Sequence, residues 1–143
     1  MQRQLILMRH GHAEEGRDDY ARRLTEAGRN AARRAGQALA RAGFNPEHVL
    51  TSPAPRAHET AELVAEACDF AGSLQAERSL YVAEEAAYLA ALRCLPEPVS
   101  RVLLVGHNPS ASALARKLGA PGGDLYPAEY VEIQLELAAW QDL

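Results

Sequence analysis

Arg9, His10 and Gly11 carry the strongest chemical signal in this chain. They directly follow the apolar run Leu5–Met8, which is too short for a helix and is typical of a strand buried on both faces. Functional side chains in open α/β sheets gather at the carboxyl ends of such strands. A cation and an imidazole at this place therefore indicate a site that handles an anion.

A second apolar run ends in the same way. Residues 102–105 read Val-Leu-Leu-Val and are followed by Gly106 and His107. Two buried parallel strands that each present a histidine at the carboxyl end predict one site to which both strands contribute.

A second arginine is expected to join this site from the start of a helix. Residues 52–60 read Ser-Pro-Ala-Pro-Arg-Ala-His-Glu-Thr and follow a short apolar strand. Pro55 suits the first helical turn, where its missing N–H is no loss. Arg56 then lies at a helix N-terminus, which already favours anions, so its charge is well placed for a phosphate.

These four residues fit phosphoryl transfer. Arg9 and Arg56 supply planar forks for the phosphate oxygens, and His10 supplies a nucleophile if its imidazole is neutral. Two nearby guanidinium groups favour that neutral form, and a hydrogen bond from its other ring nitrogen to a backbone carbonyl would leave Nε2 free. We expect His107 to donate to a phosphoryl oxygen, helped by backbone N–H groups after Pro109.

His12 forms a His-x-His pair with His10, a spacing that occurs in metal sites. Alternate residues of an extended segment face opposite ways, and no carboxylate or cysteine is spaced with the pair as a third ligand. We therefore expect neither a metal nor a cofactor at this site.

Three motifs in this order resemble the histidine phosphatase superfamily: Arg-His-Gly at 9–11, Ser-Pro-x-x-Arg-Ala-x-x-Thr at 52–60, and Gly-His at 106–107. The segments Leu24–Gly28 and Leu80–Tyr81 are similar, more narrowly, to SixA-type phosphohistidine phosphatases. The resemblance spans essentially the whole chain, and the combination is far more specific than any one motif.

The resemblance implies a phosphatase that forms phosphohistidine on His10 and acts on a phosphohistidine-bearing protein, for example a phosphotransfer domain. SixA-like chains often carry an arginine near position 22, so Arg22 either reaches the phosphate pocket or lies at a solvated helix start. Two other functions stay open. The same pocket could hydrolyse a small phosphate monoester or nucleotide-derived compound, or the chain could be a non-catalytic phosphate-binding module.

The general acid is not assigned by the sequence. Mutase-like relatives carry a glutamate and an asparagine where this chain has His12 and Gly16, which weakens a mutase function. They also carry a catalytic carboxylate after the third strand, where Glu84 and Glu85 stand here, and either of these equally suits the start of the next helix. A site without an acid favours cleavage of P–N bonds, because an imidazole leaves more easily than an alkoxide.

The composition predicts one globular domain over residues 1–143, with a net charge of −4 that argues against nucleic-acid or anionic-membrane partners. No apolar run has transmembrane length, and no signal peptide is evident. Cys68 and Cys94 have no C-x-x-C partner, and we expect two free, buried thiols in a reducing cytoplasm.

Alternating β and α patterns predict an α/β fold, a three-layer α/β/α sandwich with a mostly parallel central sheet. The last strand alternates apolar and polar residues, which indicates an antiparallel edge strand and so a mixed sheet. The resemblance implies the same architecture, of the phosphoglycerate mutase-like type. The expected strands are 4–9, 48–52, 75–80, 101–106 and 130–137, and the expected helices are 25–43, 55–68, 84–95 and 110–118.

Overall fold

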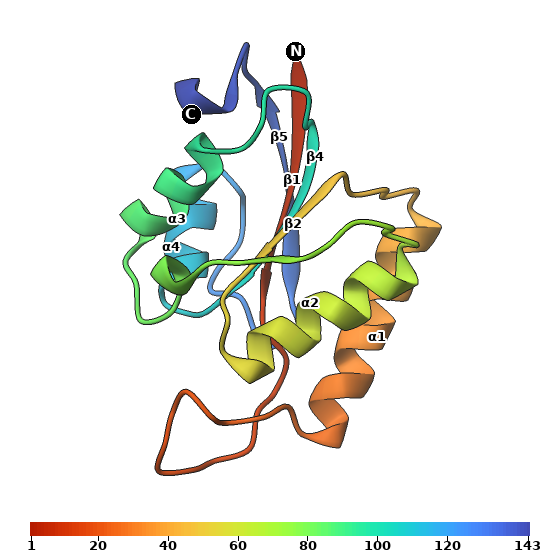
Figure 1. The fold of residues 1–143 in the computed structure, drawn as a ribbon, viewed down its shortest axis with the longest axis vertical. Helices are drawn as coiled ribbons and strands as arrows, with labels where there is room; N and C mark the ends of the chain where they lie inside the picture. The colour runs from red at the N-terminus through yellow and green to blue at the C-terminus, as the bar shows by residue number, and fades with distance from the viewer.

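A computed structural model describes all residues, 1–143, around one five-stranded sheet with strand order β3-β2-β4-β1-β5. The strands are β1 (Gln2–Arg9), β2 (His48–Thr51), β3 (Gln75–Ala76), β4 (Arg101–Gly106) and β5 (Tyr130–Glu136). The first four strands are parallel, and β5 pairs antiparallel with β1 at one edge (Figure 1). The predicted mixed sheet with an antiparallel edge strand is confirmed.

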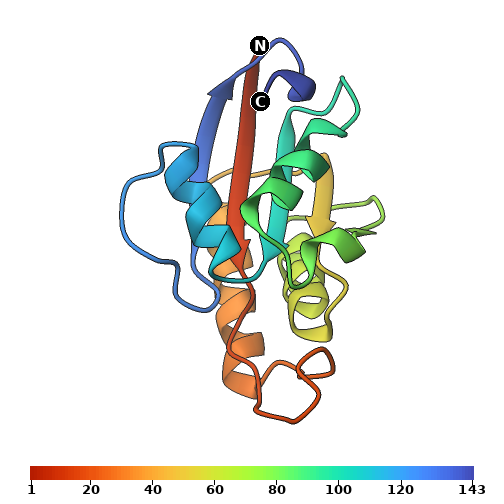
Figure 2. The ribbon, with the colours of Figure 1, turned by 90° about the vertical axis from the view of Figure 1, so that its left-hand side faces the viewer.

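Helices cover both faces of the sheet. They are α1 (Glu26–Arg41), α2 (Pro55–Ala67), α3 (Glu85–Arg93) and α4 (Ser110–Lys117). Helices α1 and α2 lie on one face and α3 and α4 on the other, and Figure 2 shows the latter two in front of the sheet. The predicted three-layer α/β/α sandwich is therefore confirmed.

Two hydrophobic cores account for the unbroken apolar strands. Successive residues of a strand point to opposite faces, so each central strand contributes to both cores. Leu5 and Leu7 of β1 belong to the core beneath α3 and α4, whereas Ile6 and Met8 belong to the core beneath α1 and α2. Because all four are essentially inaccessible to solvent, the run from Leu5 to Met8 has no polar position, and the next residue, Arg9, is the first polar one after it.

The strand predicted at 75–80 is wrong over most of its length. Only Gln75–Ala76 pairs with β2, and Arg78–Leu80 forms a 3-10 turn instead. The turn buries Leu80, whose carbonyl accepts a hydrogen bond from the Tyr88 hydroxyl at 3.2 Å. A single apolar residue at the end of this polar stretch reflects a turn into the core rather than a continuing strand.

Helix α1 begins against the loop that follows β1. The Thr25 hydroxyl accepts a hydrogen bond from the Gly28 amide at 3.0 Å, so Thr25, the first residue of the helix expected at 25–43, is the N-cap of α1. A Cβ atom at Gly28 would overlap the carbonyl oxygen of His12. Glycine at this position therefore lets the first turn of α1 lie directly on the loop that carries His10.

The two cysteines differ in exposure. Cys68 is buried at the end of α2, as expected, but Cys94 caps α3 at the surface and is exposed. The apolar sequence around Cys94 belongs to the buried face of α3, and the capping residue lies past that face. None of the helices combines the length and apolar character that a bilayer crossing requires.

Candidate active site

The parallel pairing of β1 with β4 brings the two strand-end histidines together. Arg9 is in register with Gly106, and the His10 amide donates to the Gly106 carbonyl at 3.0 Å. The imidazole centroids of His10 and His107 lie 5.1 Å apart. A cavity of about 600 Å³ opens at this edge of the sheet, and six of its lining residues are predicted site residues: Arg9, His10, Arg22, Arg56, Glu84 and His107.

The environment of His10 suits a nucleophile. Its Nδ1 atom lies 2.6 Å from the Gly11 carbonyl oxygen, and because a carbonyl only accepts, Nδ1 carries the proton and Nε2 keeps its lone pair. The pKa of His10 is lowered to about 4, chiefly by burial and then by the charges of Arg56 and Arg9, while the hydrogen bond to the Gly11 carbonyl opposes this shift. We expected the two guanidinium groups to keep His10 neutral, but burial contributes more than they do to its lowered pKa.

Arg56 is held by the helix that carries it. Only 5% of its surface is exposed. The Thr60 hydroxyl donates to the Arg56 carbonyl at 2.7 Å and accepts from the Gly11 amide at 3.1 Å. This hydroxyl joins the first turn of α2 to the loop that carries the nucleophile. Thr60 belongs to the 52–60 motif, but its role could not be assigned from the sequence.

Arg9 faces the cavity with unused donors. Its Nη1 donates to the Leu125 carbonyl at 3.1 Å, and the Asn108 side chain donates to the same oxygen at 2.8 Å. Its Nε is buried and has no partner. Burial lowers the pKa of Arg9 from its usual high value. An oxyanion in the cavity would supply the missing acceptor.

His107 is fixed through its backbone and its ring. The backbone amide donates to the Tyr88 hydroxyl at 2.9 Å, and Nε2 lies 2.8 Å from the Ser52 hydroxyl. A side chain at Gly106 would collide with the Tyr88 ring, so glycine is required there. The pKa of His107 is lowered to about 3, chiefly by burial and then by the nearby His10. Both imidazoles are therefore neutral at pH 7.

The expected contribution of the helix after Pro109 differs in detail. The Ala111 amide donates to the His107 carbonyl at 2.8 Å, and the Ser112 amide donates to the Asn108 side chain at 3.2 Å. These two N–H groups are satisfied within the protein, so they are not free for a phosphate.

Asp19 is a cavity residue whose role the sequence analysis missed. Its carboxylate accepts hydrogen bonds from the Tyr81 hydroxyl at 2.8 Å, Arg22 Nη1 at 3.0 Å and Arg56 Nη2 at 3.1 Å. The Tyr81 hydrogen bond, followed by that from Arg22, holds the pKa of Asp19 down to about 2. The carboxylate is therefore ionised at neutral pH and cannot serve as a general acid.

The family model of the histidine phosphatase superfamily (branch 1) matches residues 5–81, more than half of the chain. The chain belongs to this superfamily. Its members are phosphatases, and the matched segment contains Arg9, His10 and Arg56.

Solved structures extend the likeness of this histidine phosphatase beyond that segment. The structure named as phosphohistidine phosphatase SixA from Nakamurella multipartitia is 28% identical, with a TM-score of 0.82 over 99% of this chain and 89% of that one. A protein histidine phosphatase SixA complexed with tungstate is also 28% identical, with a TM-score of 0.81 over 90% and 86% of the two chains.

A curated relative is similar over a shorter stretch. The serine/threonine-protein phosphatase Pgam5, mitochondrial, of Drosophila ananassae is 40% identical over 63 residues. The match covers 43% of this chain and 22% of that protein, so this histidine phosphatase spans less than a quarter of the relative's length.

The two carboxylates considered as general acids are placed differently in this histidine phosphatase. Glu84 is exposed, precedes α3 as its N-cap residue and lines the cavity. Glu85 is the first residue of α3 and lies outside the lining, with a buried Oε2 atom that has no partner. Of the two, only Glu84 is placed to reach a substrate.

His12 stays apart from the histidine phosphatase site. Its Nδ1 lies 3.1 Å from the Thr25 hydroxyl, and it does not line the cavity. No three His, Cys, Asp or Glu side chains are grouped so that they could hold a metal ion.

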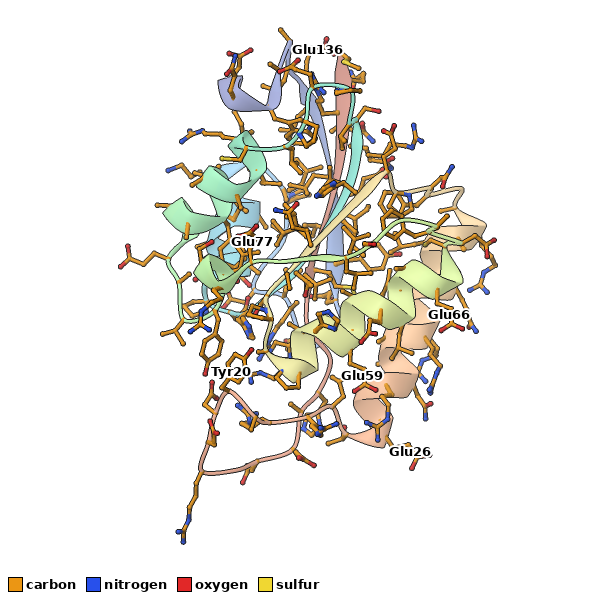
Figure 3. All side chains as sticks on the ribbon, viewed as in Figure 1. Tyr20, Glu26, Glu59, Glu66, Glu77 and Glu136 are labelled. Atoms are coloured by element: carbon orange, nitrogen blue, oxygen red, sulfur yellow. The ribbon has the colours of Figure 1, made fainter.

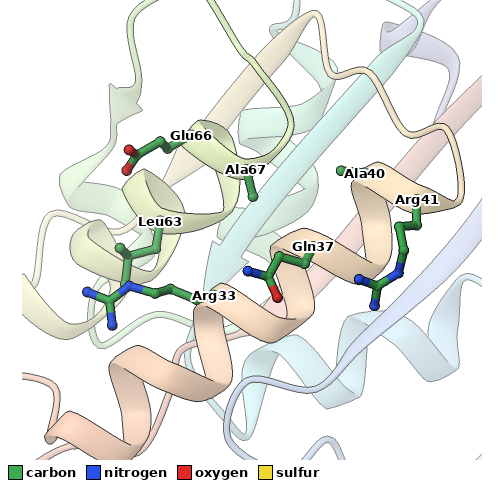
Figure 4. Close-up of a pocket in the computed structure, with 7 residues that line it drawn as sticks. All are labelled: Arg33, Gln37, Ala40, Arg41, Leu63, Glu66 and Ala67. Atoms are coloured by element: carbon green, nitrogen blue, oxygen red, sulfur yellow. The ribbon is translucent and has the colours of Figure 1, made fainter.

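Another hollow, of about 430 Å³, lies between the later turns of α1 and α2 (Figure 4). It is lined by Arg33, Gln37, Ala40, Arg41, Leu63, Glu66 and Ala67. Its lining contains no histidine and none of Arg9, His10, Arg56 and His107. This hollow therefore offers no nucleophile for phosphoryl transfer.

Proposed function

We propose that this protein hydrolyses phosphohistidine on a partner protein through a covalent phosphohistidine on His10. The observation that carries the proposal is the buried, neutral imidazole of His10, whose Nε2 is free in a cavity lined by three arginines. A module that only bound phosphate would gain nothing from a nucleophile held in this form.

The reaction follows from the placement of these groups. His10 Nε2 attacks the phosphorus, a new P–N bond forms, and the P–N bond to the substrate imidazole breaks. The other nitrogen of the substrate ring is already protonated, so the ring leaves as a neutral imidazole. Arg9, Arg56 and Arg22 face the charge on the equatorial oxygens, and His107 stabilises the transition state. Water then attacks the phosphorus, releasing inorganic phosphate and restoring neutral His10.

The absence of an evident general acid in the site supports a substrate that is cleaved at a P–N bond. Asp19 is ionised and fully engaged with its neighbours, so it has no proton to donate. An imidazole leaves as a group whose conjugate acid has a pKa of about 6.5, whereas a serine phosphate must expel an alkoxide. The names of the two SixA structures, similar over most of this chain, support the same substrate class.

One observation favours a second candidate, hydrolysis of a small phosphate monoester. Glu84 lines the cavity and is exposed, so it is free to protonate an alkoxide leaving group. If this is the activity, Glu84→Gln should lower kcat for a monoester by roughly tenfold or more. It should leave phosphohistidine hydrolysis unchanged if the first proposal holds.

The decisive experiment compares kcat/KM for a phosphohistidine protein with kcat/KM for a phosphoserine peptide. We expect a preference of roughly 10³ or more for phosphohistidine, because only the phosphoserine reaction depends heavily on a positioned acid. Similar values would contradict the proposal and favour the monoester function. Because arginines supply the counter-charge, excess chelator should leave turnover unchanged.

Rapid quenching with labelled substrate tests the covalent step. The wild-type protein should carry an acid-labile, alkali-stable label, and His10→Ala should lose both label and turnover. His12→Ala is the matched control, since it removes a histidine two residues away that does not line the cavity. A label that persists in His10→Ala would contradict the mechanism.

A further inference from the structure

We propose that Asp19 is a positioning residue, which orients the guanidinium groups of Arg56 and Arg22 toward the phosphoryl group while it is transferred to His10. The inference rests on the proposed function, because it assigns Asp19 a task in that same reaction. Asp19 comes from the loop between β1 and α1, far in sequence from both Arg56 and Tyr81, so nothing local requires these contacts.

The contacts of Arg56 show how this orientation is achieved. Asp19 accepts two hydrogen bonds from it, one at the backbone carbonyl from Nη1 at 2.7 Å and one at the carboxylate from Nη2 at 3.1 Å. Two bonds from different nitrogens fix the plane of the guanidinium group. An arginine has five N–H donors, so three remain, among them a buried Nε that has no partner.

Asp19 is itself held by a third side chain that lines the cavity, Tyr81. The Tyr81 hydroxyl donates to the same carboxylate oxygen that Arg56 Nη2 contacts, at 2.8 Å. The other carboxylate oxygen accepts from Arg22 Nη1 at 3.0 Å. The carboxylate therefore joins Arg56 and Arg22 to Tyr81.

The neighbouring Tyr20 helps to seat the loop. Its hydroxyl donates to the Pro53 carbonyl at 3.1 Å, and its ring packs edge-on against Tyr81 with centroids 4.9 Å apart. Figure 3 shows Tyr20 on the loop before α1, at the end of the molecule where α2 begins. In the exposed stretch 14–21, only Asp19 and Tyr20 form side-chain hydrogen bonds with residues outside the loop.

A positioning role differs from a blocking role in a measurable way. If the carboxylate merely occupied the place of the phosphate, its removal would raise kcat/KM. If it orients the arginines, its removal lowers kcat while oxyanion binding does not weaken, because a negative charge beside the arginines is lost.

The test measures kcat on an aryl phosphate and the Kd of tungstate for Asp19→Ala, Asp19→Asn and the control Asp18→Ala. Asp18 is the adjacent acid of the same loop, and its side chain makes no hydrogen bond. We expect Asp19→Ala to lower kcat roughly 10- to 100-fold, with tungstate bound at least as tightly as by the wild type. Asp19→Asn keeps one acceptor oxygen and should retain more of kcat, whereas Asp18→Ala should match the wild type.

A double-mutant cycle separates positioning from a general loss of structure. Tyr81→Phe removes only the hydroxyl that holds the carboxylate, so it should lower kcat less than Asp19→Ala and have no further effect in the Asp19→Ala background. An unchanged or raised kcat in Asp19→Ala, weaker tungstate binding, or additive effects of the two substitutions would each overturn the proposal. Failure of the proposed function would appear differently, as a wild-type protein that binds tungstate but turns over no phosphorylated substrate.

Discussion

Strand β1 carries an arginine near each end, and the two differ in how many of their N–H donors have an acceptor. Arg3 is wholly buried, and its guanidinium donates to four backbone carbonyls, those of Glu97, Val99, Leu137 and Ala138. It also lies 5.6 Å from the Trp140 ring. Arg9 has one acceptor, the Leu125 carbonyl, and a buried Nε with none. A guanidinium with four of its five N–H donors bound to backbone carbonyls serves the fold, whereas one with most donors unused beside a cavity is ready for a ligand.

Arg56 belongs with Arg9 in this comparison. It is nearly as buried as Arg3, yet its Nε also lacks an acceptor. Burial alone therefore does not distinguish a structural arginine from a functional one. The number of donors without an acceptor, together with a position in the lining of the cavity, does distinguish them.

The largest effect is expected at the structural end of β1. Arg3→Lys should lower the free energy of unfolding by about 3 kcal/mol, because one ammonium cannot reach four carbonyls and leaves some unpaired. Urea unfolding would measure the loss, with Arg34→Lys on the exposed surface of α1 as control. If Arg3 serves only the fold, the folded Arg3→Lys protein should keep the kcat of the wild type. A lower kcat with no loss of stability would contradict this distinction between Arg3 and Arg9.

The same substitution at Arg56, the α2 arginine that belongs with Arg9, should act on catalysis. Arg56→Lys keeps the charge but loses the planar fork, and we expect kcat/KM to fall by roughly 100-fold. The loss of stability should be smaller than for Arg3→Lys. Steady-state kinetics and urea unfolding on the two variants together make the test, and equal losses of stability would remove the distinction drawn between them.

A smaller effect is expected when the comparison is extended to His107. Its Nε2 is engaged with Ser52, whereas its Nδ1 is buried without a partner. Ser52→Ala should free the ring to turn and lower kcat by roughly tenfold, the effect of one lost orienting hydrogen bond. Ser73→Ala, in an exposed loop, is the control. A Ser52→Ala variant with full activity would mean that packing alone orients the ring.

The smallest effect concerns pH. Because the pKa of His10 is lowered to about 4, its nucleophilic neutral form persists on acidification, and activity is lost only as the pH falls through that value. Between pH 7 and pH 5, kcat/KM corrected for substrate ionisation should change less than about twofold. A histidine at the ordinary pKa of about 6.5 would lose roughly thirtyfold at pH 5, and such a profile would show that His10 is not desolvated.

Much of the fold follows from hydrophobic patterning. The runs that end at Arg9 and Gly106 are apolar at every position because each strand is covered on both faces, and this predicted both the parallel sheet and the strand ends. The edge strand β3 could not be predicted well. With one neighbour and two residues, it has too short a pattern to distinguish from the 3-10 turn that follows.

The candidate site likewise contains residues that the sequence predicted and residues whose roles it did not. Residues at strand ends and at a helix N-terminus, such as His10 and Arg56, were predictable because topology alone places them together. The roles of Asp19 and Ser52 could not be assigned, because they depend on partners 37 and 55 residues away that only the folded chain brings close. The role of Arg3 could not be predicted, because its partners are backbone carbonyls, which every residue type carries.

Gly28 takes no part in the proposed chemistry, yet it constrains the sequence as strongly as a reacting group would. Even a methyl group there would overlap the His12 carbonyl, so alanine, the smallest substitution, already forces α1 away from the nucleophile loop. In a saturation library scored for activity, position 28 should tolerate no replacement. A mutational scan would then rank it beside His10, although one position is fixed by volume and the other by reactivity.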